Sequence, residues 1–192
     1  MPSVAPWLGV DVGGRRKAFD VALVDDRRLI GWRARQSVDQ VVAWVEAATP
    51  TVIAIDSPRA CAPPGRTHRP EEKDLRDAVC GIRWTPAEAR LEGNPYYEWI
   101  VEGLRLYDAL ARRPVHVIEC FPTASWTRWH GTRAGRRRSA WTRQALAARA
   151  LRGVPSRTNQ DMRDAIGAAL TARDYERGRC QRFGDIVVPR AA

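Results

Sequence analysis

The sequence lacks the residue patterns that build zinc sites and membrane spans. Its four cysteines are widely spaced without a C-x-x-C pair, and its three histidines are not at metal-finger spacing. Free thiols in a reducing compartment are therefore expected. No stretch approaches the roughly 18 to 20 apolar residues that a membrane span requires, and residues 1–6 lack the basic and apolar regions of a secretory signal. We expect a cytoplasmic protein without a membrane partner.

Lysine is also scarce, occurring only at Lys17 and Lys73, so arginine carries nearly all of the positive charge. The formal net charge is +10 and the pI is about 10.4. Such an excess favours an anionic partner, most simply DNA or RNA, and carries no information about the fold.

The basic residues are densest in residues 133–152, which contain no acidic residue. Arginines there can contact phosphates, and an aromatic ring can stack on bases. The alternative is a solvated face or a flexible loop without a ligand. The candidate nucleic-acid-binding residues are Arg136, Arg137, Arg138, Arg143 and Trp141.

The N-terminal part reads as three strands, a helix and a fourth strand. Apolar or alternating runs predict strands at 7–12, 18–24 and 29–34, and their short connections favour an antiparallel meander. Ser37 to Gln40 match a capping box, which predicts a helix up to Pro50. The β-branched run at 51–56 predicts a strand buried on both faces.

The remainder alternates helices, loops and strands, which favours an α/β domain. We expect one domain over 1–192, with an insertion of loops and helices near 57–95 and a basic segment at 133–152. Further strands are expected at 114–120 and 185–188. Helices are expected near 71–79, 96–111, 123–129, 139–152 and 158–175.

Carboxylates stand at the ends of the predicted strands. Asp11 lies at the end of the first strand, before two glycines, Asp56 at the end of the fourth, and Glu119 at the end of the fifth. Asp161 and Asp164 share a face at the start of the last helix. An unpaired buried carboxylate costs several kcal/mol. Because the carboxyl ends of adjacent parallel strands converge on one crevice, we expect all five to meet there.

Clustered carboxylates repel one another, and divalent cations relieve that repulsion. Oxygen ligands suit Mg²⁺ or Mn²⁺ rather than Zn²⁺. Two such ions, about 3.5–4 Å apart, stabilise the attacking and leaving oxygens of a phosphoryl displacement. The pattern therefore predicts a nuclease that hydrolyses phosphodiester bonds of DNA or RNA with a metal-bound water. Its predicted catalytic residues are Asp11, Asp56, Glu119, Asp161 and Asp164.

The ordered set of motifs resembles the RNase H-like (retroviral-integrase) superfamily. It resembles more closely the bacterial family of unknown function numbered 429, described as predicted RNase H-like nucleases. The matching segments are 9–11, 54–58, 72–86, 117–122, 161–165 and 169–172. The resemblance implies a three-layer fold, in which a mixed sheet of an antiparallel three-stranded meander and parallel strands is flanked by helices.

The resemblance also implies roles for individual residues. Asp11, Asp56 and Asp164 would be the metal ligands, with Asp161 and Glu119 nearby. The D-x-x-D-A element at 161–165 is similar to the last helix of Holliday-junction resolvases, in which both aspartates serve the metal site.

Each carboxylate also has a structural explanation. Asp11 could form the turn before the glycines, and Asp56 could cap the turn at Ser57-Pro58. Glu119 could pair with an arginine, and Asp161 could be the acid of a capping box after Thr158. Asp164, one turn further into the helix, is harder to explain in this way.

Two other functions compete with a nuclease. One is a catalytically silent module that binds nucleic acid or a protein. The other is an actin-like phosphotransferase, which is disfavoured because such folds need two domains and a second glycine-rich phosphate loop.

Overall fold

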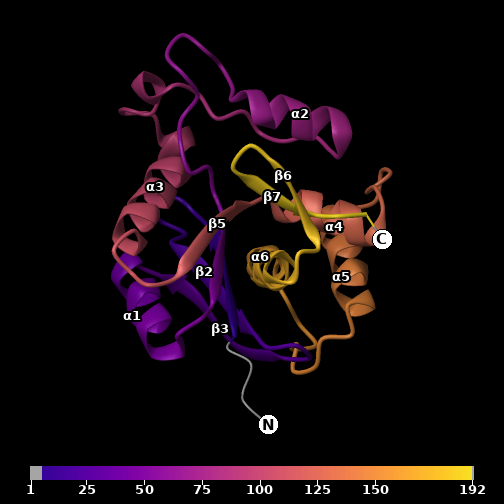
Figure 1. Cartoon of the computed structure of the whole chain (residues 1–192). Helices are drawn as coiled ribbons and strands as arrows, with labels where there is room; N and C mark the ends of the chain where they lie inside the picture. The colour runs from indigo at the N-terminus through magenta and orange to yellow at the C-terminus, as the bar shows by residue number, and fades with distance from the viewer. Residues whose placement is uncertain (1–5, 192) are drawn as a thin grey trace.

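The computed structural model describes residues 6–191, which form a seven-stranded sheet flanked by helices (Figure 1). The strand order is β3-β2-β1-β4-β5-β7-β6. The strands are β1 (Trp7–Val12), β2 (Phe19–Val24), β3 (Leu29–Gln36), β4 (Val52–Asp56), β5 (His116–Cys120), β6 (Cys180–Phe183) and β7 (Ile186–Pro189).

The sheet is mixed, as predicted. Strands β1, β2 and β3 form an antiparallel meander, and β4, β5 and β7 continue the sheet in parallel from β1. Strand β6 returns antiparallel to β7 at the edge. The parallel part brings the carboxyl ends of β1, β4 and β5 to the same end of the sheet, which is where a crevice is expected.

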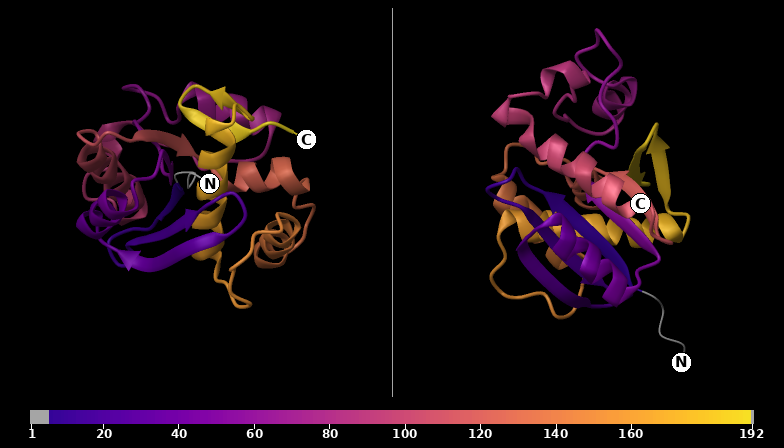
Figure 2. Two further views of the ribbon diagram at one scale, coloured as in Figure 1. Left: turned by 60° about the horizontal axis from the view of Figure 1, so that its bottom comes forward. Right: turned by 90° about the vertical axis from the view of Figure 1, so that its left-hand side faces the viewer.

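Helices cover both faces of the sheet (Figure 2). Helix α6 (Gln160–Glu176) lies on one face, between the strands and the pair α4 (Pro122–His130) and α5 (Arg138–Ala148). Helices α1 (Val38–Ala48) and α3 (Glu98–Leu110) cover the other face. The segment between β4 and α3 carries α2 (Pro70–Ala78) and the 3₁₀ turns η1 (Glu88–Arg90) and η2 (Pro95–Tyr97), and it projects beyond the sheet (Figure 1).

Helix α6 is the buried centre of the molecule. Every residue from Met162 to Asp174 is buried, and those that meet the strands are small, including Ala165, Ala168 and Ala169. Small side chains let a helix lie close to a sheet, so the start of α6 is held near the ends of β1 and β4.

The predicted elements are present with shifted ends. The capping box at Ser37 is confirmed. The cap of α6 is Asn159, whose side chain accepts from the amide of Met162, rather than Thr158. Strand β6 was not predicted, because the sequence Cys-Gln-Arg-Phe of this edge strand has no apolar alternation. No helix within residues 6–191 combines the length and apolar character needed to cross a bilayer.

Candidate active site

Asp11 and Asp56 lie side by side at the carboxyl ends of β1 and β4. They are direct partners in the parallel pairing of the two strands, whose backbones are typically about 4.8 Å apart. Side chains alternate along a strand, and Gly9 and Ala54, two residues earlier, face α6. Both carboxylates therefore face α6. Within the described residues, neither carboxylate has a hydrogen-bond or ion-pair partner.

Asp164 reaches the same place from the first turns of α6 and is fully partnered. Its Oδ1 accepts from Trp126 Nε1 at 3.2 Å and from Gln160 Nε2 at 3.0 Å. Its Oδ2 accepts from Gln160 Nε2 at 3.0 Å and from Arg138 Nη2 at 2.8 Å. The carboxylate is thus oriented by a buried indole and an amide, and its charge is balanced by an arginine.

Asp161 lies one turn earlier in α6, nearer to solvent. Its carboxylate pairs with Lys17 Nζ at 3.2 Å. Because the cap of the helix is Asn159, Asp161 is not the acid of a capping box after Thr158. Lys17 belongs to the loop after β1, so this pair ties the loop to the start of α6.

The pKa values of the three inner aspartates are all raised. Burial, and then repulsion by Asp56 and Asp164, holds the pKa of Asp11 well above its usual range. Burial and the negative charge of Asp164 raise the pKa of Asp56 to about 8, against the opposing effect of Arg138. Burial raises the pKa of Asp164, although Arg138 lowers it. Burial in all three, and mutual proximity for Asp11 and Asp56, therefore disfavour the ionised carboxylates, and a cation would relieve this cost.

A further carboxylate, Asp20, joins the cluster and was missed in the sequence. It is the antiparallel partner of Asp11 on β2 and is 6% exposed. The amide of Arg35 donates to its Oδ1 at 3.2 Å, and its Oδ2 has no partner within residues 6–191. Burial and the charge of Asp161 raise its pKa. The alternating run 18–24 could have indicated this position, because Asp20 lies on the opposite face of the strand from Phe19 and Val21.

Glu119 is held differently from the aspartates. In the pairing of β4 with β5 it is the partner of Ile55, so Cys120, not Glu119, lies level with Asp56. Its side chain alternates with Ile118 and Cys120, which pack on the α6 face. Its carboxylate accepts from Arg69 Nη1 at 2.9 Å and from the amide of Arg59 at 2.8 Å. These contacts match the structural explanation of Glu119 as the partner of an arginine.

The basic segment divides into exposed arginines and a buried tryptophan. Arg136, Arg137, Arg138 and Arg143 are exposed at the start of α5, as a nucleic-acid contact requires. Trp141 is only 1% exposed and donates Nε1 to the carbonyl of Gly131 at 3.1 Å. The prediction that Trp141 stacks on bases is therefore wrong, because its ring packs in the core beneath α5.

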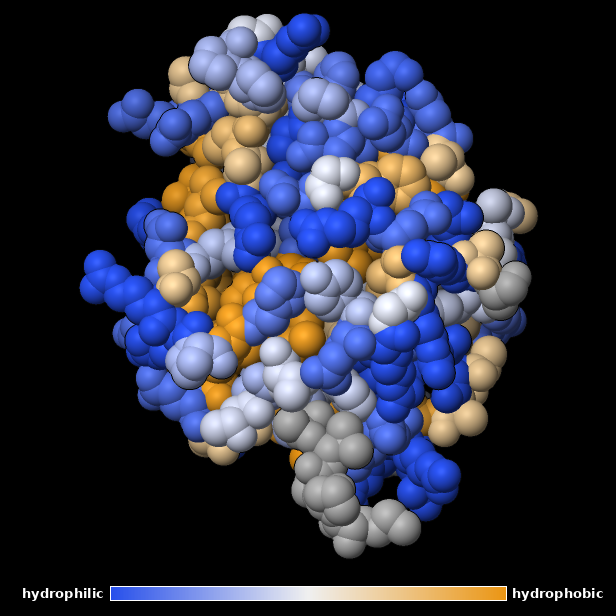
Figure 3. Space-filling view, viewed as in Figure 1, coloured by the Kyte–Doolittle hydropathy of each residue, from blue (hydrophilic) through white to orange (hydrophobic). Residues whose placement is uncertain are grey.

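All five predicted carboxylates (Asp11, Asp56, Glu119, Asp161 and Asp164) line one cleft of about 870 Å³, together with the cationic residues Lys17, Arg83 and Arg138. Figure 3 shows strongly hydrophilic residues over the α4–α5 side of the molecule and hydrophobic ones in the middle of the same face. The cleft has negative groups at its floor and arginines at its rim, an arrangement that can receive a phosphate backbone above bound cations.

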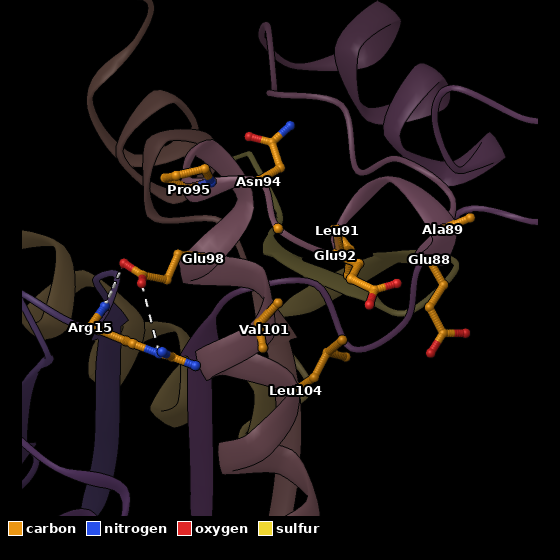
Figure 4. A pocket seen from close by; sticks show the side chains of 11 residues that line it. Arg15, Glu88, Ala89, Leu91, Glu92, Asn94, Pro95, Glu98, Val101 and Leu104 are labelled. Carbon is orange, nitrogen blue, oxygen red and sulfur yellow. Dashed lines mark hydrogen bonds and ion pairs between the residues drawn. The ribbon is translucent and has the colours of Figure 1, made fainter.

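A second hollow, of about 830 Å³, lies between α3 and the η1–η2 segment (Figure 4). It contains none of the predicted catalytic residues. Arg15 of the loop after β1 borders it, and the amide of Arg15 donates to Glu98 at 3.0 Å. The same loop carries Lys17, so its two ends are fixed to α3 and to Asp161.

The aspartates fit a hard divalent cation. They offer oxygen donors alone, which suit Mg²⁺ or Mn²⁺, and Asp11 and Asp56 have no competing partner in the described chain. Among residues 6–191, no three His, Cys, Asp or Glu side chains have already converged as a metal-binding group. Arg138 and Lys17 take up oxygens of Asp164 and Asp161 instead. A cation bound through Asp164 would thus compete with Arg138.

Comparison with solved structures identifies the fold as RNase H-like. RuvC of T. thermophilus in complex with a Holliday junction substrate matches with a TM-score of 0.56 and 14% identity, over 90% of this chain and 96% of RuvC. A second structure of Thermus thermophilus RuvC matches with a TM-score of 0.51 and 15% identity, over 89% of this chain and 95% of that one.

The family is also established. Residues 9–187 match the family described as protein of unknown function (DUF429), and the chain belongs to that family. A search of curated proteins finds no match. Together, the family and the fold support the expected resemblance to RNase H-like nucleases.

Proposed function

We propose that this protein is a metal-dependent nuclease that hydrolyses phosphodiester bonds of DNA or RNA. One observation carries the proposal: Asp11, Asp56 and Asp164 come from three separate elements and line one cleft, where burial raises the pKa of each and the charge of Asp164 raises the pKa values of Asp11 and Asp56 further. Burying carboxylates close together lowers the stability of the fold, so a purely structural role does not explain the arrangement. A site that binds divalent cations requires it.

The residues have distinct roles in this proposal. Asp11, Asp56 and Asp164 hold Mg²⁺ or Mn²⁺, and Asp161 lies at the mouth of the site. When bound, such ions supply positive charge that activates water and stabilises the oxygens of a phosphoryl displacement. Trp126 and Gln160 keep the carboxylate of Asp164 in its orientation. Glu119, committed to Arg69, holds the segment between β4 and α3 in place.

Nucleic acid is the proposed partner. The net charge of +10 and the exposed arginines at the start of α5 would attract a phosphate backbone. The likeness to RuvC in complex with a Holliday junction adds branched DNA to the candidate substrates.

A catalytically silent nucleic-acid-binding module is the second candidate. The contacts of Arg138 with Asp164 and of Lys17 with Asp161 favour it, because arginine and lysine can neutralise the carboxylates without any metal. This alternative predicts salt-dependent binding of nucleic acid without metal-dependent cleavage.

Cleavage of a substrate panel tests the proposal. The panel contains single-stranded, duplex and four-way-junction DNA, RNA and an RNA–DNA hybrid, with Mg²⁺, Mn²⁺ or EDTA. Asp11→Asn, Asp56→Asn and Asp164→Asn are compared with Asp74→Asn, an exposed aspartate on α2. We expect cleavage by the wild type and Asp74→Asn alone, and none in EDTA. Binding of nucleic acid without cleavage under any condition would favour the silent module.

A further inference from the structure

The ion pair between Arg138 and Asp164 joins an exposed side chain to a buried one. The Asp164 side chain is 3% exposed, and Trp126, one of its donors, is fully buried. The Arg138 side chain is 44% exposed and reaches Asp164 from the rim of the cleft. Of the residues that bond to Asp164, Arg138 is therefore the most accessible to solvent or a ligand, since Gln160 is half-buried and Trp126 is buried.

The backbone of Arg138 is firmly placed although its side chain is accessible. Arg138 is the first residue of α5, and this helix is anchored by the buried Trp141 and by Thr142, whose Oγ1 accepts from Arg163 Nε at 2.8 Å. A fixed backbone with a long, half-exposed side chain lets the guanidinium move between neighbouring partners without rearranging the fold.

The start of α5 also suits a phosphate. Its first turn has no side-chain cap and no acidic residue, and the free amides of a helix N-terminus attract anions. Arginine adds a planar fork of donors that matches phosphate oxygens. A phosphate placed there would compete with Asp164 for the guanidinium of Arg138.

We propose that Arg138 couples nucleic-acid binding to metal binding. Without nucleic acid, its guanidinium remains on Oδ2 of Asp164 and opposes a divalent cation there. A backbone phosphate draws the guanidinium away and leaves that oxygen available to the cation. The inference rests on the proposed function, because it takes Asp164 as a metal ligand.

The coupling is reciprocal, so nucleic acid strengthens metal binding by the same factor as metal strengthens nucleic-acid binding. Couplings of this kind are typically 5- to 150-fold. This coupling would keep the affinity for the metal low until a substrate is bound.

Titration of Mn²⁺ by calorimetry, with and without a short phosphorothioate oligonucleotide, tests this inference without relying on activity. We expect the oligonucleotide to tighten Mn²⁺ binding by the wild type at least about 5-fold. Arg138→Gln should bind Mn²⁺ more tightly than the wild type in the absence of nucleic acid. Adding the oligonucleotide should increase the Mn²⁺ affinity of this variant only slightly. Arg138→Lys, which keeps the charge but not the fork, should retain part of the coupling.

Arg28→Gln is the matched control. Arg28 is exposed and pairs with Asp25 at 2.8 Å, the same distance as the pair of Arg138 with Asp164, but it lies at the opposite end of β2 from Asp20. Its coupling should equal that of the wild type. If Arg138→Gln binds Mn²⁺ like the wild type and keeps the coupling, the inference is wrong while the proposed function stands. If the wild type and all variants fail to bind Mn²⁺, both are wrong.

Discussion

Gly9 of β1 lies directly against the backbone of Ala169 in α6. A Cβ atom built on Gly9 would be 2.1 Å from the amide nitrogen of Ala169 and 2.2 Å from the carbonyl oxygen of Ala165. No side chain fits between the strand and the helix at this point. Because Asp11 follows two residues later and Asp164 directly precedes Ala165, the same contact sets how closely the two aspartates approach each other.

Replacing Gly9 should therefore damage both stability and the site. Gly9→Ala must push α6 away from β1, and overpacking of this kind costs typically 1–3 kcal/mol and occasionally more. We expect a loss at or above about 3 kcal/mol in urea unfolding. Gly81→Ala is the control, since nothing lies within 4 Å of a Cβ there. Equal stability of the two variants would contradict the close contact.

The raised pKa of Asp56 makes the metal-free protein less stable as pH rises. The carboxyl of Asp56 stays protonated in the folded state up to about pH 8, whereas in the unfolded chain it ionises near its ordinary value of 3.8. The contribution of the protonated Asp56 carboxyl to the free energy of unfolding is complete below about pH 4 and is lost as the pH rises through about 8. Because the asparagine side chain of Asp56→Asn cannot ionise, this variant should not lose stability in this way as the pH rises.

Thermal unfolding in EDTA measures the effect. Between about pH 5 and pH 8, the melting temperature of the wild type should fall several degrees more than that of Asp56→Asn. Adding Mn²⁺ at the higher pH should restore stability to the wild type but much less to Asp56→Asn, because a ligand stabilises only the folded state that binds it. Parallel pH curves for the two proteins would refute the prediction.

Removal of Glu119 should destabilise the fold. The Arg69 and Glu119 side chains are only 3% and 4% exposed, and breaking a buried ion pair by removing one partner typically costs about 3–5 kcal/mol. We expect a loss of this size for Glu119→Gln in denaturant unfolding. In the double variant with Arg69→Gln, the two losses of stability should not add, because both residues belong to one buried ion-pair network, in which Arg69 also contacts Glu71 and Glu72.

The same variant separates a structural from a catalytic Glu119. If Glu119→Gln is less stable than the wild type but still cleaves nucleic acid below its unfolding transition, Glu119 has the structural role of holding the segment between β4 and α3. A stable Glu119→Gln without cleavage would support the catalytic role predicted from the sequence.

The exposed arginines of the basic segment should control the salt dependence of nucleic-acid binding. Each phosphate contact contributes roughly 0.9 to the slope of log K against log salt for duplex DNA. Arg136→Gln and Arg143→Gln should each lower the slope by about 1 and weaken binding similarly for all sequences. Fluorescence anisotropy over a salt series measures this, with Arg28→Gln as the control. An unchanged slope would mean that these arginines face only solvent.

Much of the fold and part of the site could be predicted from the sequence. The strand ending in Asp11 and the β-branched strand ending in Asp56 were recognised because local hydrophobic patterns determine such elements. The spacing of Asp161 and Asp164 in one helix was equally local. These features depend on neighbours in the chain, so they can be read without tertiary structure.

Other features depended on residues far apart in the sequence. The role of Trp141 was mispredicted because an arginine-rich context does not reveal that its ring is buried. Asp20 was missed because its place beside Asp11 requires the pairing of β1 with β2. The pairing of Arg138 with Asp164 requires α5 to pack beside α6.

Local sequence patterns are enough to predict most of the helices and strands, their order and the aspartates near their ends, because propensity and periodicity act between close neighbours. All five carboxylates line the cleft, and long-range packing sets which of them are held by a lysine or an arginine. The register of β5 against β4 places Cys120 level with Asp56 and leaves Glu119 to Arg69. A shift of one residue in a strand turns a side chain to the other face, and that register is set by packing across the whole sheet.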